Sequence, residues 1–171
     1  MPTPKIDQNY IETALPELKN YLLSDILFYP LMGQLPRLTI GGLLLAQRRL
    51  RAGNLGTHLD LKLATLRDKW RAAWEKKSAQ EMDARLTLWR NYLSDYRTDP
   101  ENYATDYRHE VRWRVMLELL AKEVDQIPTE IGVLDELLHV KFIKGKFLWD
   151  KNLQNQFAQD KFWFLYGKLL G

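Results

Sequence analysis

The stretch THLDLKLATLRDKWRAAWEKKSAQEMDARLTLWRNYLSDY, residues 57–96, decides the fold class of this 171-residue chain. Its apolar side chains recur in steps of three and four, in two runs: Leu59, Leu63, Leu66, Trp70 and Ala73, then Met82, Leu86, Trp89, Leu93 and Tyr96. That spacing lines one face of an α-helix, whereas a half-buried strand would alternate at every second residue. The stretch contains no Gly and no Pro, so it predicts helix throughout.

The two apolar runs differ in phase, which leaves two interpretations open. Continuing the first run leads to Lys77 and Gln80, and Ser78 with Glu81 fits a capping box. Either one long helix changes its buried face near residues 76–80, or two helices meet there. The absence of Gly and Pro from the intervening EKKSAQE favours one long helix.

The same spacing predicts helices on both sides of this stretch. Each begins at a capping residue and ends at Gly, Pro or a loss of period, and the predicted ranges are 13–29, 40–52, 99–126 and 131–143. Pro16 fits the first of them if Thr13 is its N-cap, because proline is tolerated in the first helical turn. We therefore expect an all-α fold in which residues 1–171 form a single compact domain of about five or six helices. Short connections make antiparallel neighbours the expectation.

Two apolar segments stand apart from the predicted helices. Residues 28–38 are punctuated by Pro30, Gly33 and Pro36 and should form an apolar loop. The terminal stretch DKFWFLYGKLL, residues 160–170, would be apolar around its whole circumference as a helix, and such a helix must be buried on every side. We expect a buried C-terminal segment. Strand-like alternation is limited to a weak signal in KFIKGKFLW, residues 141–149.

Composition excludes several classes of protein. The chain has no cysteine, so disulfides, thiolate nucleophiles and cysteine-ligated metals are excluded. The first ten residues lack the apolar core of a signal peptide. The longest apolar run, Ile40 to Ala46, is far short of the roughly 20 residues that a membrane span requires. We expect a cytoplasmic protein without a membrane partner.

Motifs for catalysis and metal binding are weak. No phosphate-binding glycine loop, nucleophile elbow or zinc-protease signature occurs. Asp106 with His109, and Glu136 with His139, have the three-residue spacing of carboxylate-bridged metal bundles. His139 falls outside the apolar stripe of its helix, however, so that half of the site would face solvent. We predict a protein that is not an enzyme, with no metal, no cofactor and no small-molecule ligand inferred.

The surplus of apolar surface favours a non-catalytic protein-interaction or assembly subunit, which binds a protein partner or itself. The candidate contact residues are Phe28, Tyr29, Leu31, Trp163, Phe164 and Tyr166. The alternative is a nucleic-acid-binding module that uses the basic N-terminal third, since residues 1–77 hold 12 Lys and Arg against 7 Asp and Glu. The candidates for phosphate contact are Arg48, Arg49, Arg51, Arg67 and Arg71.

Overall fold

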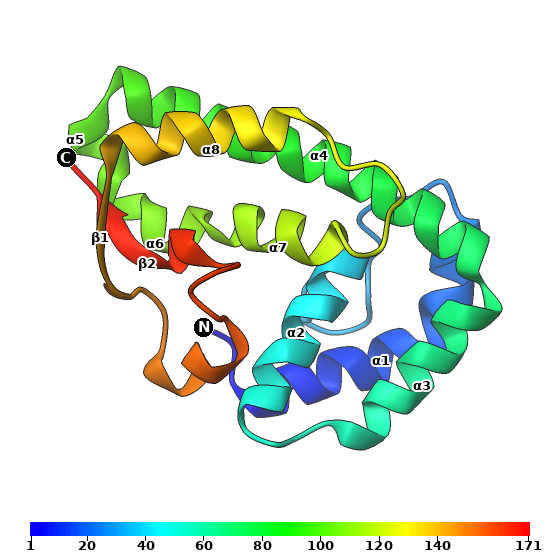
Figure 1. Ribbon diagram of the computed structural model, residues 1–171. Helices are drawn as coiled ribbons and strands as arrows, with labels where there is room; N and C mark the ends of the chain where they lie inside the picture. The colour runs from blue at the N-terminus through cyan, green and yellow to red at the C-terminus, as the bar shows by residue number, and fades with distance from the viewer.

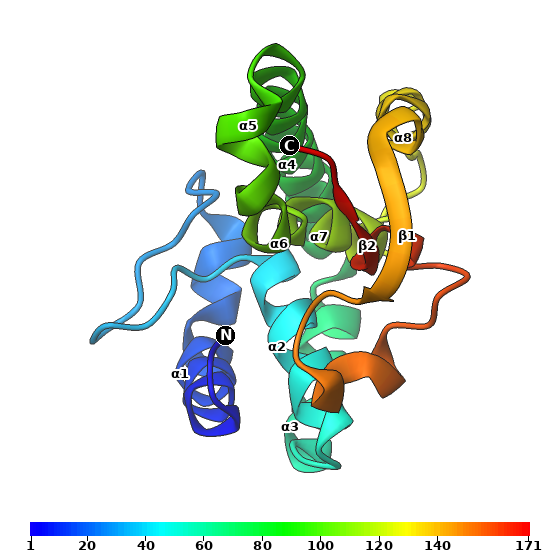
Figure 2. The same ribbon diagram turned by 90° about the vertical axis from the view of Figure 1, so that its left-hand side faces the viewer.

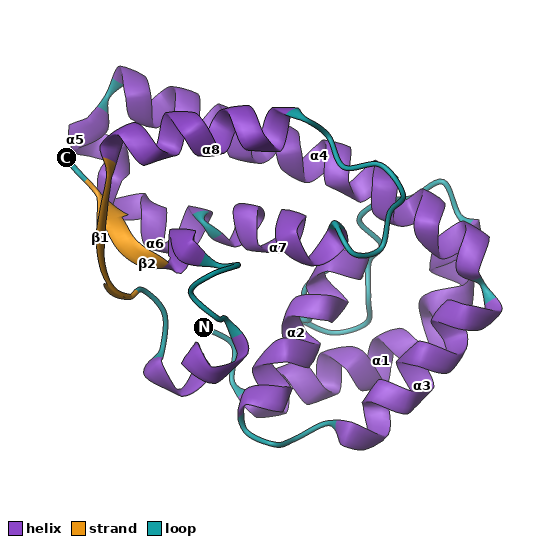
Figure 3. Cartoon of the chain, in the orientation of Figure 1, coloured by secondary structure: helices purple, strands orange, loops and turns teal.

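The structure, a computed structural model that describes all residues 1–171, is mostly helical (Figure 1, Figure 3). The α-helices are α1 (Pro4–Leu23), α2 (Ile40–Ala52), α3 (Thr57–Lys69), α4 (Arg71–Thr98), α5 (Pro100–Tyr103), α6 (Tyr107–Glu110), α7 (Arg112–Leu120) and α8 (Glu130–Lys141). Three 3₁₀ turns are η1 (Ala104–Asp106), η2 (Lys151–Gln156) and η3 (Trp163–Leu165), and two strands are β1 (Phe142–Phe147) and β2 (Tyr166–Leu169). The helical class is confirmed, but the predicted count of five or six helices is too low and a small sheet is present.

The helices form two groups that meet at α2. Helices α4, α7 and α8 run alongside one another, with α1, α2 and α3 grouped below them (Figure 1). Helix α2 contacts α1, α4 and α7, so it joins the two groups. No helix combines the length and the apolar character needed to cross a membrane.

Helix α1 begins earlier than predicted. Its N-cap is Thr3, whose hydroxyl accepts a hydrogen bond from the Ile6 amide at 3.3 Å, and Pro16 lies inside the helix instead of in its first turn. An interior proline removes one backbone hydrogen bond and normally disrupts a helix. The helix continues because buried side chains anchor it on both sides of Pro16: Tyr10, Ile11, Ala14, Leu18, Tyr21 and Leu22.

Residues 57–96 form two helices, not one, and the break lies at Trp70 instead of at residues 76–80. Trp70 leaves the helical region, with φ −112° and ψ 36°, between α3 and α4. The expected change of buried face within 76–80 is also wrong, because Lys77, Ser78 and Glu81 are all buried in the interior of α4. The stripe therefore continues through polar residues, which a reading of apolar spacing alone does not detect.

Each charged member of this polar stripe has partners. Lys77 Nζ donates to the carbonyl oxygens of Ser24 at 2.7 Å and Ile26 at 3.0 Å. Glu81 and Arg85 are paired with each other. Buried polar groups are tolerated when their hydrogen bonds are made, so α4 can direct this face inward.

The C-terminal segment is buried as expected, but it is not a helix. After η3 the chain forms β2, which pairs antiparallel with β1, and Phe142 lies opposite Leu169. Strand β1 begins within the helix predicted for residues 131–143 and includes Gly145, which follows that range. The core side chains that the segment contributes are Phe157, Phe162, Phe164, Leu165, Tyr166 and Leu169. The Tyr107 hydroxyl further fixes it by donating to the Phe164 carbonyl at 2.6 Å.

The apolar loop is held at its base and projects at its tip. Tyr29 and Leu38 exchange backbone hydrogen bonds of 3.1 and 2.7 Å, which closes the loop like a short hairpin. We call residues 26–36 the apolar arm. Figure 2 shows the loop between α1 and α2 extending away from the helices. At its tip Met32 is 87% exposed.

Candidate functional site

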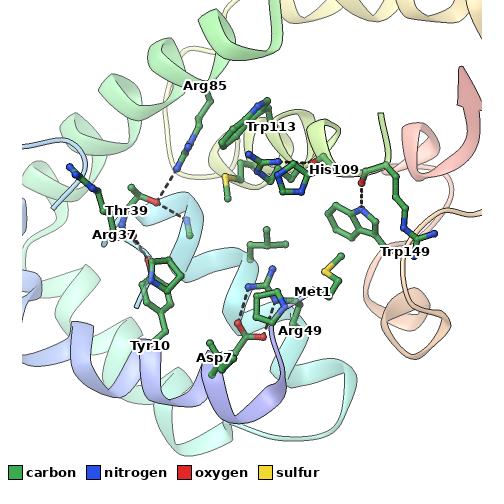
Figure 4. A pocket seen from close by; sticks show the side chains of 18 of the residues that line it. Met1, Asp7, Tyr10, Arg37, Thr39, Arg49, Arg85, His109, Trp113 and Trp149 are labelled. Carbon is green, nitrogen blue, oxygen red and sulfur yellow. Dashed lines mark hydrogen bonds and ion pairs between the residues drawn. The ribbon is translucent and has the colours of Figure 1, made fainter. Parts of the chain in front are cut away.

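A cleft with a volume of about 680 Å³ lies beside the base of the apolar arm (Figure 4). Its walls come from α1, the arm, α2, α4, the η1–α7 region and Trp149. The apolar wall residues include Ile6, Phe28, Leu45, Trp113, Met116 and Trp149. Five arginines but only two aspartates also line it: Arg37, Arg49, Arg85, Arg108 and Arg112, with Asp7 and Asp106. The cleft is therefore apolar and basic.

Arg85 is the most deeply placed of these cations. Its side chain is 7% exposed, and its guanidinium carbon lies 5.0 Å from the Phe28 ring centre and 4.8 Å from that of Trp113. Nε donates to Glu81 and Nη2 to the Thr39 hydroxyl, at 3.3 and 3.2 Å. Nη1 has no protein partner, so part of a buried cation remains free to bind an acceptor.

Glu81 fixes the position of Arg85 by pairing with its Nε atom. Both Glu81 carboxylate oxygens lie 3.0 Å from the Gly41 amide at the first turn of α2, where the helix dipole favours an anion. Burial raises the pKa of Glu81, while Arg85 and the Gly41 amide act in the opposite direction. A Cβ atom at position 41 would overlap Glu81 Oε2, so any residue other than glycine would displace this carboxylate.

The other arginines differ in how far they are neutralised. Arg49 forms a two-point ion pair with Asp7, at 2.8 and 2.9 Å. Arg112 lies over the Trp113 ring at 3.9 Å and reaches Glu110 at 3.2 Å. Arg37 and Arg108 are exposed at the rim and neither has a carboxylate partner. The rim therefore carries the uncompensated positive charge.

A second hollow lies on the other side of the apolar arm. It has a volume of about 500 Å³ and its arm residues are Ile26, Tyr29, Pro30, Leu31 and Met32, which face Thr13, Pro16 and Glu17 of α1. The arm therefore separates two hollows and exposes apolar side chains, and Ile26 is 47% exposed in addition to Met32.

The residues predicted to contact a partner have different locations. Phe28 lines the cleft, while Tyr29 and Leu31 line the hollow beyond the arm. Trp163 is half-buried and stacks on His139, with ring centres 3.9 Å apart. Phe164 is fully buried and Tyr166 nearly so. These last two are core residues, since a partner could reach them only if the paired strands β1 and β2, the C-terminal hairpin, separated from the helices.

The five arginines predicted to contact nucleic acid do not form one surface. Arg49 turns into the cleft toward Asp7, whereas Arg48 donates to the Gln156 carbonyl at 2.7 Å on another face of α2. Arg51 pairs with Asp60 at 3.1 Å. Arg67 and Arg71 each have a carboxylate of Asp68 within 4 Å, at 3.5 and 3.9 Å.

Sequence reasoning missed the residues that define the cleft: Arg37, Arg85, Arg108, Trp113 and Trp149. The one available signal was Arg85 on the buried stripe of α4, a position that demands a partner for a buried charge. Asp106 and His109 both line the cleft, but no group of three or more His, Asp or Glu side chains is arranged to hold a metal ion. No protein family, curated protein or solved structure that was compared with this chain matches it.

Proposed function

We propose that the protein is a non-catalytic interaction subunit, and that its basic cleft docks an acidic segment of a partner protein that also carries apolar side chains. The observation that carries this proposal is the combination of five arginines with aromatic walls in one cleft bordered by a bare apolar arm. The proposal keeps the interaction role inferred from the sequence and moves its centre to the cleft.

Charge supports an acidic partner. Three carboxylates near the cleft are already engaged, Asp7 with Arg49, Glu81 with Arg85 and Glu110 with Arg112. Asp106 is the one lining carboxylate without an ion pair, against five arginines. This leaves Arg37 and Arg108 at the rim and Nη1 of Arg85 in the wall for acidic side chains. Rim charges of this kind increase the rate at which an oppositely charged partner associates.

The shape of the site favours a protein segment over a small molecule. A volume of about 680 Å³ would also admit an organic anion, since small-ligand pockets span roughly 300–1,000 Å³. A small ligand would not require the adjoining arm, where Met32 and Ile26 are exposed beside a second hollow. A partner segment would cover the arm and the cleft together, and contiguous apolar surface commonly marks such contacts.

The nucleic-acid alternative stays a prediction. Its five arginines do not share one face: Arg48, Arg51 and Arg67 line one small cleft, whereas Arg49 and Arg71 do not. Four of the five have carboxylate neighbours, so the geometry adds little support to a nucleic-acid surface. A high ultraviolet absorbance ratio in the purified protein that falls with salt would revive it.

The proposal can be tested by selecting ligands for the purified protein from a random displayed-peptide library. We expect the selected peptides to be rich in Asp or Glu and to contain Leu, Phe or Trp. Replacing both rim arginines, R37E and R108E, should weaken a selected peptide about tenfold or more, because each substitution turns an attraction into a repulsion. Met32→Asp should weaken it as well.

The matched control is Arg97→Glu, a charge reversal at an exposed position of α4 with no ion pair. It should leave peptide affinity within about twofold of the wild type, because a distant surface charge is screened. Selected peptides without acidic residues, or peptide binding that ignores the double reversal, would contradict the proposal. Tight binding of the apolar anion anilinonaphthalene sulfonate with no peptide selected would instead indicate a small-ligand site.

A further inference from the structure

A smaller, polar cleft lies on the opposite side of α2 from the 680 Å³ cleft lined by Arg85 and Trp113, which we call the docking cleft. It has a volume of about 270 Å³, and the two clefts share no lining residue. The helical period explains the separation: Gly42, Leu45 and Arg49 face the docking cleft, whereas Leu44, Arg48 and Arg51 face the polar one. Three of the five arginines singled out in the sequence therefore meet here, since Arg67 of α3 also lines the polar cleft.

The acidic residues of the polar cleft are engaged by other groups. Asp60 accepts hydrogen bonds from Gln47 at 2.6 Å and from Arg51 at 3.1 Å. Glu123 accepts from the indole N–H of Trp74 at 3.0 Å, and its distance to Arg67 Nη1 is 3.9 Å. Neither carboxylate therefore pairs closely with Arg48 or Lys122, the remaining cations of the cleft.

Two cations of the cleft have donor groups without acceptors. Arg67 Nε is buried and makes no hydrogen bond, although native proteins satisfy the great majority of such atoms; Asp68 Oδ1 lies 3.5 Å from it, an ion pair without hydrogen-bond geometry. Arg48 uses only Nη1, which donates to the Gln156 carbonyl, while its guanidinium lies 5.2 Å from the Phe162 ring centre. Fixed donors that lack acceptors are what a preformed oxyanion site provides.

The cations also repel one another. Burial and the neighbouring Arg51 lower the pKa of Arg48, and burial together with Arg48 and Lys161 lowers the pKa of Lys122. Glu118 acts in the opposite direction on both groups and Glu123 on Lys122, but both pKa values remain lowered. Positive groups placed close together with too few carboxylates carry an electrostatic cost that a bound anion would remove.

We propose that the cleft formed by Arg48, Arg51, Arg67 and Lys122 binds a phosphate group, either as inorganic phosphate or as the phosphoryl group of a small phosphomonoester. Planar guanidinium groups bind two phosphate oxygens at once, and a lysine adds a mobile point charge. The volume of the cleft suits one phosphoryl group with a small substituent against Leu44 and Leu63, not a nucleic-acid strand.

The test is thermal unfolding and calorimetric titration of the full chain with inorganic phosphate, with glycerol phosphate, and with chloride at equal ionic strength. We expect both phosphate compounds to raise the unfolding temperature above that in chloride, because a ligand that binds only the folded state stabilises it. The tighter of the two compounds identifies the source of the phosphoryl group.

Lys122→Gln should weaken phosphate binding about tenfold, because it removes one charged contact from an exposed side chain and leaves the core untouched. Arg67→Gln should also weaken phosphate binding about tenfold, which tests the site through a second residue. Lys146→Gln, at an exposed lysine of β1 that does not line the cleft, is the control and should bind phosphate like the wild type.

Three results would overturn the site. They are no stabilisation by phosphate beyond that by chloride, equal weakening in Lys146→Gln and Lys122→Gln, and oligonucleotide binding that Lys122→Gln weakens as much as it weakens phosphate binding. None of these results bears on peptide binding in the docking cleft, so the two proposals fail or succeed separately.

Discussion

At the scale of single residues, the absence of a Cβ atom at Gly41 allows Glu81 to lie against α2 and thereby positions Arg85 in the wall of the docking cleft. Glu81 is fully buried and takes both of its backbone hydrogen bonds from Gly41. Arg85 depends on Glu81 and on Thr39 for its position in the cleft wall. A side chain at position 41 would displace the carboxylate, and the guanidinium would move with it.

We therefore predict that Gly41→Ala lowers the free energy of unfolding by about 1–3 kcal/mol through overpacking. It should also weaken peptide binding in the docking cleft, because Arg85 loses its support. Chemical denaturation monitored by circular dichroism measures the first effect.

Gly132→Ala is the matched control, because a Cβ atom at position 132 of α8 would meet nothing within 4 Å. We expect it to raise stability by about 0.4–1 kcal/mol, since alanine reduces the freedom of the unfolded chain. If both glycine variants change stability equally, the close approach of Gly41 to Glu81 does not constrain the fold.

At the scale of elements, apolar spacing predicts helices well and the ends of helices poorly. Most of the stripe of residues 59–96 is buried as the spacing requires, including position 77, where the residue is lysine. The expected change of buried face at residues 76–80 was wrong, because the buried positions there are occupied by polar residues, which do not appear in a pattern of apolar spacing. The break at Trp70 has no Gly or Pro to announce it, and it follows from tertiary packing, in which Trp74 is fully buried and bonded to Glu123.

The C-terminal hairpin was missed for a different reason. A continuous apolar run is compatible with a buried helix or a buried strand, and periodicity alone cannot separate them. The partner strand β1 carries the weak alternation seen in residues 141–149, but the pairing joins segments more than fifteen residues apart. Gly167 permits it, because a Cβ atom there would overlap the Ile143 carbonyl and be crowded by the Phe142 ring.

We predict that Phe164→Ala costs about 3–5 kcal/mol of stability, the usual cost of removing a fully buried aromatic ring. Leu170→Ala, one residue beyond β2 and 50% exposed, should change stability by about 0.5 kcal/mol or less.

Truncation after Gln159 removes five buried side chains worth about 1.5–3 kcal/mol each, which rivals the ~5–15 kcal/mol stability of a whole domain. It should yield no soluble folded protein, and a truncated chain that keeps its unfolding temperature would contradict this role of the hairpin.

At the scale of the whole molecule, the docking cleft is a product of long-range folding. Its wall residues extend from Met1 before α1 to Trp149 after β1, with Arg85 and Trp113 from two different helices. No local pattern links them, so only the assembled fold brings them together. The polar cleft was closer to prediction, because Arg48, Arg51 and Arg67 were already marked by their charge. What the sequence could not indicate was that Arg49, their neighbour, turns to the other side of α2.

Buried tyrosines connect the same distant segments. Six tyrosine hydroxyl groups donate to backbone carbonyls. Four of these bonds are those of Tyr10 to Arg37, Tyr21 to Leu27, Tyr92 to Tyr103 and Tyr107 to Phe164, at 2.6–3.1 Å. They join α1 to the loop that precedes α2, α4 to α5, and α6 to the C-terminal segment. Each bond requires the protonated phenol, because a phenolate has no proton to donate to a carbonyl.

Burial raises the pKa of all four tyrosines above the ordinary value of 10.0. In the unfolded chain they lose their protons near pH 10, so above that pH the folded state holds more protons and stability falls as the pH rises. Lys77 and Lys122, whose pKa values burial lowers, act in the opposite direction, but they are two groups against four. We predict that the protein is stable up to about pH 10 and unfolds cooperatively at higher pH. The phenolate absorbance of these four tyrosines should appear over the same pH range in which the helical circular dichroism is lost. In concentrated urea all eight tyrosines should instead titrate as one set near pH 10. If the native protein also ionises all eight smoothly near that pH while its helical signal stays unchanged, these phenols are not the buried links between segments described above.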